Sequence, residues 1–246
     1  GIGSLTASIV EHIDEASEAI DISVNAYEID SIMRSGLSQT SERLSADYGV
    51  NVNIVPNDFV EHSHEVLSPD LFADKNEGFT GYDLAILNPP YKKISTNSRH
   101  RKLLSGLSIE TSNLYSAFMA LSILHLKDGG QMVSIVPRSF CNGTYFRSFR
   151  NFLRASFRIT RIHLFDSRKD AFKDNQVLQE NMIIAGFKCS DVGAASAKVV
   201  ISKSSNDDFI DCEELTVSES TLWGNDREGF LFIPSTAGEA QSINFM

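Results

Sequence analysis

Hydrophobic and polar positions along the chain repeat with two periods, one typical of strands and one typical of helices. Short apolar runs of strand length are separated by longer stretches in which apolar residues recur at helical spacing. The expected strands cover residues 22–30, 50–56, 83–87, 131–136, 158–165 and 181–188. The expected helices cover residues 5–13, 31–47 and 113–126, and a further helix begins near residue 143. This alternation predicts an α/β fold with a doubly wound, mostly parallel sheet.

A glycine turn opens the chain. Gly1-Ile2-Gly3 leads directly into the first expected helix, and a glycine turn before a helix is half of a strand–turn–helix nucleotide site. The strand that would come before this turn is missing, so we expect the first strand of the fold to be truncated. An ordinary tight turn is the alternative interpretation of so short a pattern.

Two stretches interrupt the alternation of strands and helices. Residues 60–80 are polar and are expected to form a loop. His62 and His64 are expected to be solvated, because no acid-rich group of metal ligands surrounds them, and a metal site is the alternative. After Lys188 the composition shifts to serine, aspartate and alanine, with expected strands at residues 197–202 and near 230–233. We therefore expect one domain over residues 1–190 and an appendage over residues 191–246.

Acidic residues follow the first two expected strands. Glu28 stands where Rossmann-like folds place the acceptor for ribose hydroxyls, although an acid that starts a helix would occupy the same position. Asp58 and its aromatic neighbour Phe59 follow the next strand, and such a pair can accept a hydrogen bond from an adenine amino group and pack against the ring. With the glycine turn, three successive elements carry residues suited to a nucleotide cofactor.

The third expected strand ends abruptly at Asn88-Pro89-Pro90-Tyr91. Pro89 fixes its own φ and keeps Asn88 out of the helical region, so the chain must leave the strand in an extended conformation. This exit presents the Asn88 side-chain oxygen, the Pro89 carbonyl and the Tyr91 ring at the carboxyl end of a strand, where open α/β sheets bind ligands. Two acceptors beside a stacking surface suit a planar group that carries an NH2.

Composition limits the class of protein without changing this interpretation. The chain has 246 residues, of which 42% are hydrophobic and 22% charged, as in ordinary globular proteins. No apolar run approaches the roughly 20 residues that span a bilayer, so we expect a soluble, cytoplasmic protein. Cys141, Cys189 and Cys212 are too few and too scattered for a disulfide framework or a zinc site, and no metal is expected.

Positive charge is concentrated in two segments of a chain whose net charge is −10. The first follows the Asn-Pro-Pro-Tyr sequence and has five cations and no acid, which suits a loop that binds phosphates. Its cations are Lys92, Lys93, Arg99, Arg101 and Lys102. Residues 138–173 contain nine cations and only two acids, and they are expected to form a wall facing nucleic acid, with a solvated helix face as the alternative.

With these residues in view, the chain resembles the catalytic core of gamma-class, TaqI-type DNA adenine-N6 methyltransferases of restriction-modification systems. The resemblance covers roughly residues 1–188, and Asn-Pro-Pro-Tyr after an apolar strand is its most specific element. The supporting motifs follow in the family's order: residues 1–3, 28–30, 57–59, 113–118 and 128–137.

The resemblance implies a Rossmann-like methyltransferase fold with an antiparallel last strand, and S-adenosylmethionine as the methyl donor. The implied cofactor-binding residues are Gly1, Gly3, Glu28, Ile29, Asp58, Phe59, Pro90 and Phe118. The implied catalytic residues are Asn88, Pro89, Pro90 and Tyr91. Tyr91 and Phe172 would stack on the two faces of an adenine turned out of the duplex. The expected partners are double-stranded DNA and a specificity or restriction subunit or domain, and residues 191–246 would begin the target-recognition region.

Two alternatives stay open at this stage. The same arrangement of acceptors also suits the NH2 of an RNA adenine or of a protein glutamine. A non-catalytic fragment that retains the fold is the alternative from a different class of protein.

Overall fold

The structure is a computed structural model. It describes residues 1–16, 21–68, 80–165, 181–189, 197–204, 212–223 and 228–243. The chain divides into two compact units, residues 1–66 and residues 67–246.

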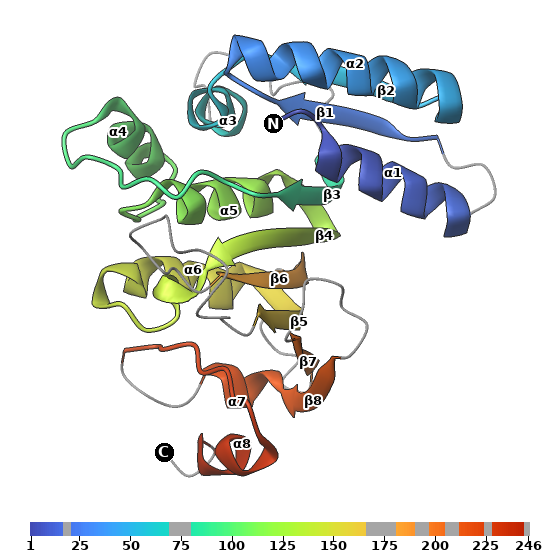
Figure 1. Cartoon of the computed structure of the whole chain (residues 1–246). Coiled ribbons are helices and arrows are strands. Elements are labelled where there is room, and N and C mark those ends of the chain that lie inside the picture. Colours follow the sequence, from blue (N-terminus) through green and yellow to red (C-terminus); the bar gives the residue numbers. More distant parts are fainter. Residues whose placement is uncertain are drawn as a thin grey trace, which may run out of the picture. The chain divides into compact units, whose positions relative to one another are not determined.

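The first unit is built on two parallel strands. Its elements are α1 (Ser4–Ala16), β1 (Ser23–Tyr27), α2 (Ser31–Tyr48), β2 (Asn51–Val55) and α3 (Phe59–Leu67) (Figure 1). The two strands pair in register from Ser23 opposite Asn51 to Tyr27 opposite Val55, so their carboxyl ends meet at one edge.

Helices cover both faces of this small sheet because side chains alternate along each strand. Val24 and Val52 pack with α1 and α2 around a buried cluster of Ala7, Val10, Leu44 and Val50. Tyr27 lies three positions after Val24 and therefore points to the other face, where it contacts Phe59 of α3. The unit is doubly wound, as the sequence predicts.

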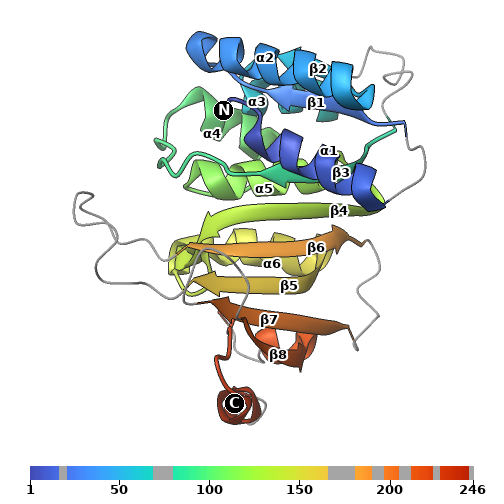
Figure 2. The same cartoon turned by 45° about the vertical axis from the view of Figure 1, so that its right-hand side comes forward.

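The second unit is a six-stranded mixed sheet with the order β3-β4-β6-β5-β7-β8, which Figure 2 shows from one edge to the other. The strands are β3 (Tyr82–Leu87), β4 (Leu126–Pro137), β5 (Phe157–Phe165), β6 (Asn181–Lys188), β7 (Lys198–Ser204) and β8 (Glu213–Ser218). The helices are α4 (Arg99–Gly106), α5 (Leu114–His125), α6 (Arg147–Ser156), α7 (Glu219–Trp223) and α8 (Ala237–Ile243), with the short 3-10 turns η1 (Arg138–Phe140) and η2 (Thr144–Phe146).

The strand directions confirm the predicted mixed topology. β3, β4, β5 and β7 run in the same direction, and β6 is antiparallel to both of its neighbours, β4 and β5. The last predicted core strand is therefore the antiparallel one. α5 lies in the core of this unit, with nine of its residues buried, and packs against β3, β4 and α6.

Three local predictions are wrong. Residues 59–67 form α3 rather than a loop, because Asp58 caps the helix and Glu61 stands three positions later, the spacing of a capping box. Residues 99–106 of the basic segment form α4, which Ser98 caps. The strand after β7 is β8, not residues 230–233, which form no strand although Leu231 and Phe232 donate backbone hydrogen bonds to Cys141 and Leu222.

β7 and β8 continue the same sheet beyond Lys188. β7 pairs with β5 in parallel, and α7 is attached by a buried ion pair between Arg158 and Glu219, 3.4 Å apart, with both side chains less than a tenth exposed. The domain boundary near residue 190 stays a prediction. None of the helices in the described ranges is long and apolar enough to cross a membrane.

We expect Glu219→Gln to lower the free energy of unfolding of the second unit by about 3 kcal/mol, since breaking a buried ion pair leaves a charge without its counter-ion. The matched control is Glu214→Gln, which breaks the half-exposed Arg161–Glu214 pair and should cost less than about 1 kcal/mol. Urea unfolding followed by the fluorescence of Trp223, the single tryptophan, measures both. Equal losses would contradict the structural role of the buried pair.

Candidate functional site

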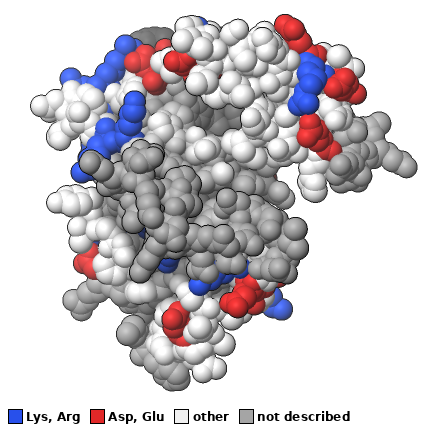
Figure 3. Space-filling view, viewed as in Figure 1, with Lys and Arg blue, Asp and Glu red and all other residues white. Residues whose placement is uncertain are grey.

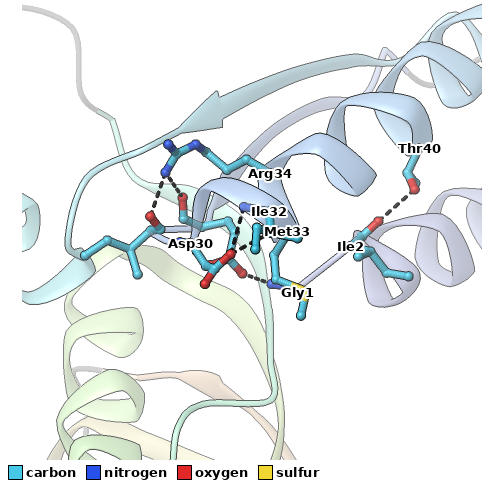
Figure 4. A network of polar contacts seen from close by, with 9 residues as sticks. Gly1, Ile2, Asp30, Ile32, Met33, Arg34 and Thr40 are labelled. Carbon is cyan, nitrogen blue, oxygen red and sulfur yellow. Dashed lines mark hydrogen bonds and ion pairs between the residues drawn. The ribbon is translucent and has the colours of Figure 1, made fainter.

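The glycine turn is fixed against α2 in the first unit (Figure 4). Gly3 has φ +91°, and a Cβ on it would lie 2.9 Å from Leu37 and 3.0 Å from Thr40. The Thr40 hydroxyl donates to the carbonyl of Ile2 at 2.7 Å. Only glycine fits this position without strain, which gives the short glycine motif a physical basis.

Glu28 follows β1 directly, and its carboxylate lies at this turn. One oxygen accepts from the Asp30 backbone N–H at 2.8 Å, and the other contacts the amino group of Gly1. Arg34 donates to the carbonyls of Glu28 and Ile29 and so holds the bend between β1 and α2. Ile29 itself is 63% exposed.

The acid that starts α2 is Asp30, not Glu28. The Asp30 carboxylate accepts from the backbone N–H groups of Ile32 and Met33, and these hydrogen bonds lower the pKa of Asp30. The role of an acid that starts a helix, which was the alternative interpretation of Glu28, is thus taken by Asp30.

Asp58 and Phe59 lie at the same edge, after β2. One Asp58 oxygen accepts from the N–H groups of Val60 and Glu61 and caps α3. The Phe59 ring meets Tyr27 edge to face, with centroids 4.9 Å apart, and the Tyr27 hydroxyl is 3.2 Å from His62 Nδ1. The sequence pointed to neither Tyr27 nor His62 as a support for this corner.

In the first unit the structure thus brings Gly1, Gly3, Glu28, Asp58 and Phe59 to one sheet edge. Glu28 N–H donates to the Val55 carbonyl at 3.2 Å, which fixes the two strand ends side by side. The binding role of each of these residues stays a prediction.

In the second unit, β3 ends at Leu87, and residues 88–92 form neither helix nor strand. Asn88 and Pro90 are exposed, Pro89 is buried and Tyr91 is half-buried. The Tyr91 hydroxyl lies 3.3 Å from Asn88 Oδ1 and 3.2 Å from the carbonyl oxygen of Ile135. We call residues 88–91 the ledge.

An aromatic cluster that includes Tyr115 of α5 packs against the Tyr91 ring. Tyr91 meets Tyr115 of α5 edge to face at 6.2 Å, and Tyr115 lies 5.7 Å from the ring of Phe146. The Tyr115 hydroxyl is 2.9 Å from the Ser139 hydroxyl, and burial raises the pKa of Tyr115 to about 12. Tyr115 and Ser139 are supporting residues that the sequence did not single out.

The ledge is also tied to the start of α5. Lys93 and Asn113 form an antiparallel bridge, Ile94 N–H donates to the Ser112 carbonyl at 2.7 Å, and Leu114 N–H donates to the Lys92 carbonyl at 2.8 Å. These bonds leave the side chains of Lys92 and Lys93 exposed.

The other predicted phosphate ligands lie on α4. Arg99 and Lys102 are exposed, whereas Arg101 is half-buried, pairs with Glu110 at 3.0 Å and donates to the Thr111 carbonyl. Figure 3 shows lysine and arginine side chains gathered in the region that Figure 1 labels α4. Their role in binding phosphates stays a prediction.

The prediction that the cations of residues 138–173 face nucleic acid is wrong for two arginines. Arg150 is fully buried and Arg158 is 7% exposed. Arg147 lies 4.0 Å from Glu228, and Arg161 is paired with Glu214. A count of charges along the sequence does not distinguish arginines that face solvent from arginines that hold the fold together.

Phe118 and Phe172 are the remaining predicted site residues. Phe118 is half-buried on α5. Phe172 lies outside the described residues. Within the described ranges, no group of three or more His, Cys, Asp and Glu side chains is placed to hold a metal ion.

Comparison with known proteins places this arrangement among methyltransferases. Residues 16–172 match the family described as Eco57I restriction-modification methylase. The chain is 42% identical to type II methyltransferase M.BsuBI of Bacillus subtilis over 97% of this chain and 47% of the relative. It is 44% identical to type II methyltransferase M.PstI of Providencia stuartii over 74% of this chain and 36% of the relative. The chain thus spans about half the length, or less, of these relatives.

Solved structures share the fold. A modification subunit of a candidate type I restriction enzyme from Vibrio vulnificus superposes with a TM-score of 0.64 at 12% identity, over 94% of this chain and 52% of the other. A candidate class I S-adenosylmethionine-dependent methyltransferase from Listeria monocytogenes gives 0.59 at 14% identity, over 84% of this chain and 56% of the other. The predicted Rossmann-like methyltransferase fold is confirmed.

The buried Tyr115 hydroxyl predicts alkaline instability. Its pKa is raised in the folded state, so stability is complete below pH 10 and falls as the pH rises toward 12, by about 1 kcal/mol per pH unit. We expect Tyr115→Phe to reduce this slope in urea unfolding followed by Trp223 fluorescence between pH 9 and pH 11. Tyr145→Phe, which removes an exposed hydroxyl, is the control and should keep the wild-type slope. An unchanged slope in Tyr115→Phe would contradict the assignment.

Proposed function

Because the chain belongs to the family of Eco57I restriction-modification methylases, we propose that it carries the catalytic core of a DNA methyltransferase that methylates N6 of adenine. The observation that carries this proposal is the ledge, where the Asn88 side chain is exposed directly after β3 beside a supported tyrosine ring. The type II methyltransferases at 42% and 44% identity support the same reaction class.

The ledge suits the difficult step of this reaction. The N6 lone pair of adenine is delocalised into the ring, which makes the amino group a poor nucleophile. The Asn88 side-chain oxygen and the Pro89 carbonyl would accept hydrogen bonds from the two N6–H groups and stabilise the positive charge that develops as N6 attacks. Acceptors fixed by two prolines need no reorganisation, and holding the reactants in line can contribute about 7 to 11 kcal/mol.

Tyr91 would bind the base itself. An adenine must leave the duplex to reach the ledge, which costs a few kcal/mol. Stacking on an aromatic side chain stabilises the flipped base by roughly 1 to 3 kcal/mol. Tyr91 is held by Tyr115 and by the Ile135 carbonyl, so its ring offers a preset face. Phe172 is proposed for the opposite face.

Residues of the first unit fit S-adenosylmethionine. The Glu28 side chain is only 13% exposed and lies at the glycine turn, where it would accept from the ribose hydroxyls. Ile29 would cover the adenine of the cofactor, Asp58 would accept from its amino group, and Phe59 would supply an apolar wall. When bound, S-adenosylmethionine supplies the electrophilic methyl group.

The proposed partner is double-stranded DNA in the cytoplasm of a prokaryote. The exposed cations Lys92, Lys93, Arg99 and Lys102 would bind its phosphates. Recognition of a base sequence would need a target-recognition region, and a specificity or restriction subunit or domain would complete the restriction-modification system.

Incubation with S-adenosylmethionine labelled in its methyl group tests the substrate class. The purified protein is offered unmethylated bacterial DNA, RNA of matched length and whole-cell protein in separate reactions. Label recovered as N6-methyladenine in DNA supports the proposal. Label in RNA or in protein glutamine would favour the alternatives that use the same ledge, and no transfer despite folding would favour a non-catalytic role.

Asn88→Ala should reduce methyl transfer at least about 100-fold, the loss typical of removing one group that stabilises developing charge. Binding of S-adenosylmethionine, measured by calorimetry, should remain close to that of the wild type. Asn97→Ala, at an exposed asparagine in the following loop, is the matched control and should change neither quantity. Parallel loss of binding and transfer in Asn88→Ala would remove Asn88 from the chemistry.

Tyr91→Ala should lower kcat/KM on fully paired DNA by roughly 5- to 150-fold, the equivalent of 1 to 3 kcal/mol of stacking. Tyr91→Phe keeps the ring and should retain most of the activity. The loss in Tyr91→Ala should shrink when the target adenine faces an abasic site, because flipping then costs less. The same loss on paired and abasic targets would show that Tyr91 does not stack on a flipped base.

A further inference from the structure

Tyr145 is the most exposed large hydrophobic side chain of the described residues. Its side chain is 85% exposed, in the turn η2 between β4 and α6. The other exposed large apolar side chains in the described part of the chain are Ile2, Ile29, Ile32 and Met33, all in the first unit. A single exposed apolar side chain is common on protein surfaces. What sets Tyr145 apart is how firmly the backbone around it is held.

Hydrogen bonds from Arg150 hold the backbone of the turn that carries Tyr145. The Arg150 guanidinium is fully buried and donates to the Phe140 carbonyl at 2.9 Å and to the Gly143 carbonyl at 2.7 Å. On its other side it donates to the carbonyls of Glu228 and Gly229 and lies over the Phe230 ring. One buried cation thus ties the turn to a segment almost 80 residues away in the sequence.

The residue after Tyr145 is fixed as firmly. Phe146 is only 6% exposed, and its ring lies 5.7 Å from Tyr115. A Cβ at Gly143 would lie 3.1 Å from both the Ser139 carbonyl and the Phe146 ring, so the turn is tight. Tyr145 is therefore exposed to solvent on a backbone that is held before it by the hydrogen bond to the Gly143 carbonyl and after it by the buried Phe146 ring. A preset aromatic group binds with less loss of conformational entropy than a mobile one.

The turn η2 follows the carboxyl end of β4, on the side of the sheet where β3 ends at the ledge. β3 and β4 are parallel, with Leu87 opposite Ser134, so both strands end on the same side. The ring contacts continue from Tyr91 to Tyr115 and from Tyr115 to Phe146. Tyr145 is covalently adjacent to the last ring of this series. Arg147 stands two positions after Tyr145, and its 53% exposed side chain lies 4.0 Å from the carboxylate of Glu228, which is 47% exposed.

We propose that Tyr145 is a DNA-contacting residue that stacks on a nucleotide flanking the flipped adenine, with Arg147 on the adjoining phosphate. The inference rests on the proposed function, because a duplex that delivers an adenine to the ledge must lie across this sheet edge. A stacking ring next to a cation is the pairing by which proteins hold nucleic-acid strands without reading sequence. Tyr145 therefore contributes to holding the DNA beside the site, whereas the ledge performs the chemistry.

The test compares Tyr145→Ala, Tyr145→Phe and the control Thr144→Ala, an exposed neighbour in the same turn. Methyl transfer to unmethylated bacterial DNA and binding of S-adenosylmethionine are measured for each. We expect Tyr145→Ala to raise the KM for DNA about tenfold, with kcat and cofactor binding within about twofold of the wild type. Tyr145→Phe and Thr144→Ala should behave like the wild type.

A second measurement detects the contact directly. DNA in which thymine is replaced by 5-iodouracil is irradiated in complex with the protein, and the crosslinked peptide is identified by mass spectrometry. A crosslink at Tyr145 that is lost in Tyr145→Ala supports the contact.

The outcomes separate this inference from the function on which it rests. If the wild type methylates DNA but Tyr145→Ala has an unchanged KM for DNA, the proposed contact is overturned and the methyltransferase function stands. The same holds if crosslinks form only at other residues. Failure of the folded, cofactor-binding wild type to methylate any DNA overturns both.

Discussion

The restriction that Pro89 places on Asn88 is the constraint on which the candidate site depends. A residue before proline is kept out of the helical region, so β3 cannot turn directly into a helix. Pro89 is buried, and Asn88 is left exposed at the end of the strand. The rest of the second unit supports this exit, through the bridge between Lys93 and Asn113 and the aromatic cluster behind Tyr91.

Two buried cations join distant segments of the second unit. Arg150 gathers four backbone carbonyls, two from the turn after β4 and two from residues 228 and 229. Arg158 attaches α7 to β5 through Glu219. The segment after residue 212 therefore contributes to the rigidity of the sheet edge where the ledge lies, although it is distant in sequence.

The sequence predicts those parts of the structure that depend on local pattern. The strand and helix periods predicted the doubly wound sheet. Local pattern says little about burial, because it does not show that Arg150 and Arg158 lie inside the fold. β8 was missed because its exposed glutamates hide the alternation of an edge strand, and residues 230–233 look like a strand but are held by contacts with Cys141 and Leu222. The supports of the site, such as Tyr115 and Ser139, come from elements far apart in the chain and need the tertiary structure to be recognised.

The Tyr91 hydroxyl has a single proton and two acceptors within reach, Asn88 Oδ1 and the Ile135 carbonyl. The Asn88 side-chain oxygen has two lone pairs, so it can accept from Tyr91 and also from an incoming amino group. When the Tyr91 proton points to Ile135 instead, both lone pairs are open. The Asn88 acceptor can therefore stay hydrogen-bonded in the absence of substrate, and rotation about one C–O bond of Tyr91 frees its second lone pair while the backbone stays in place.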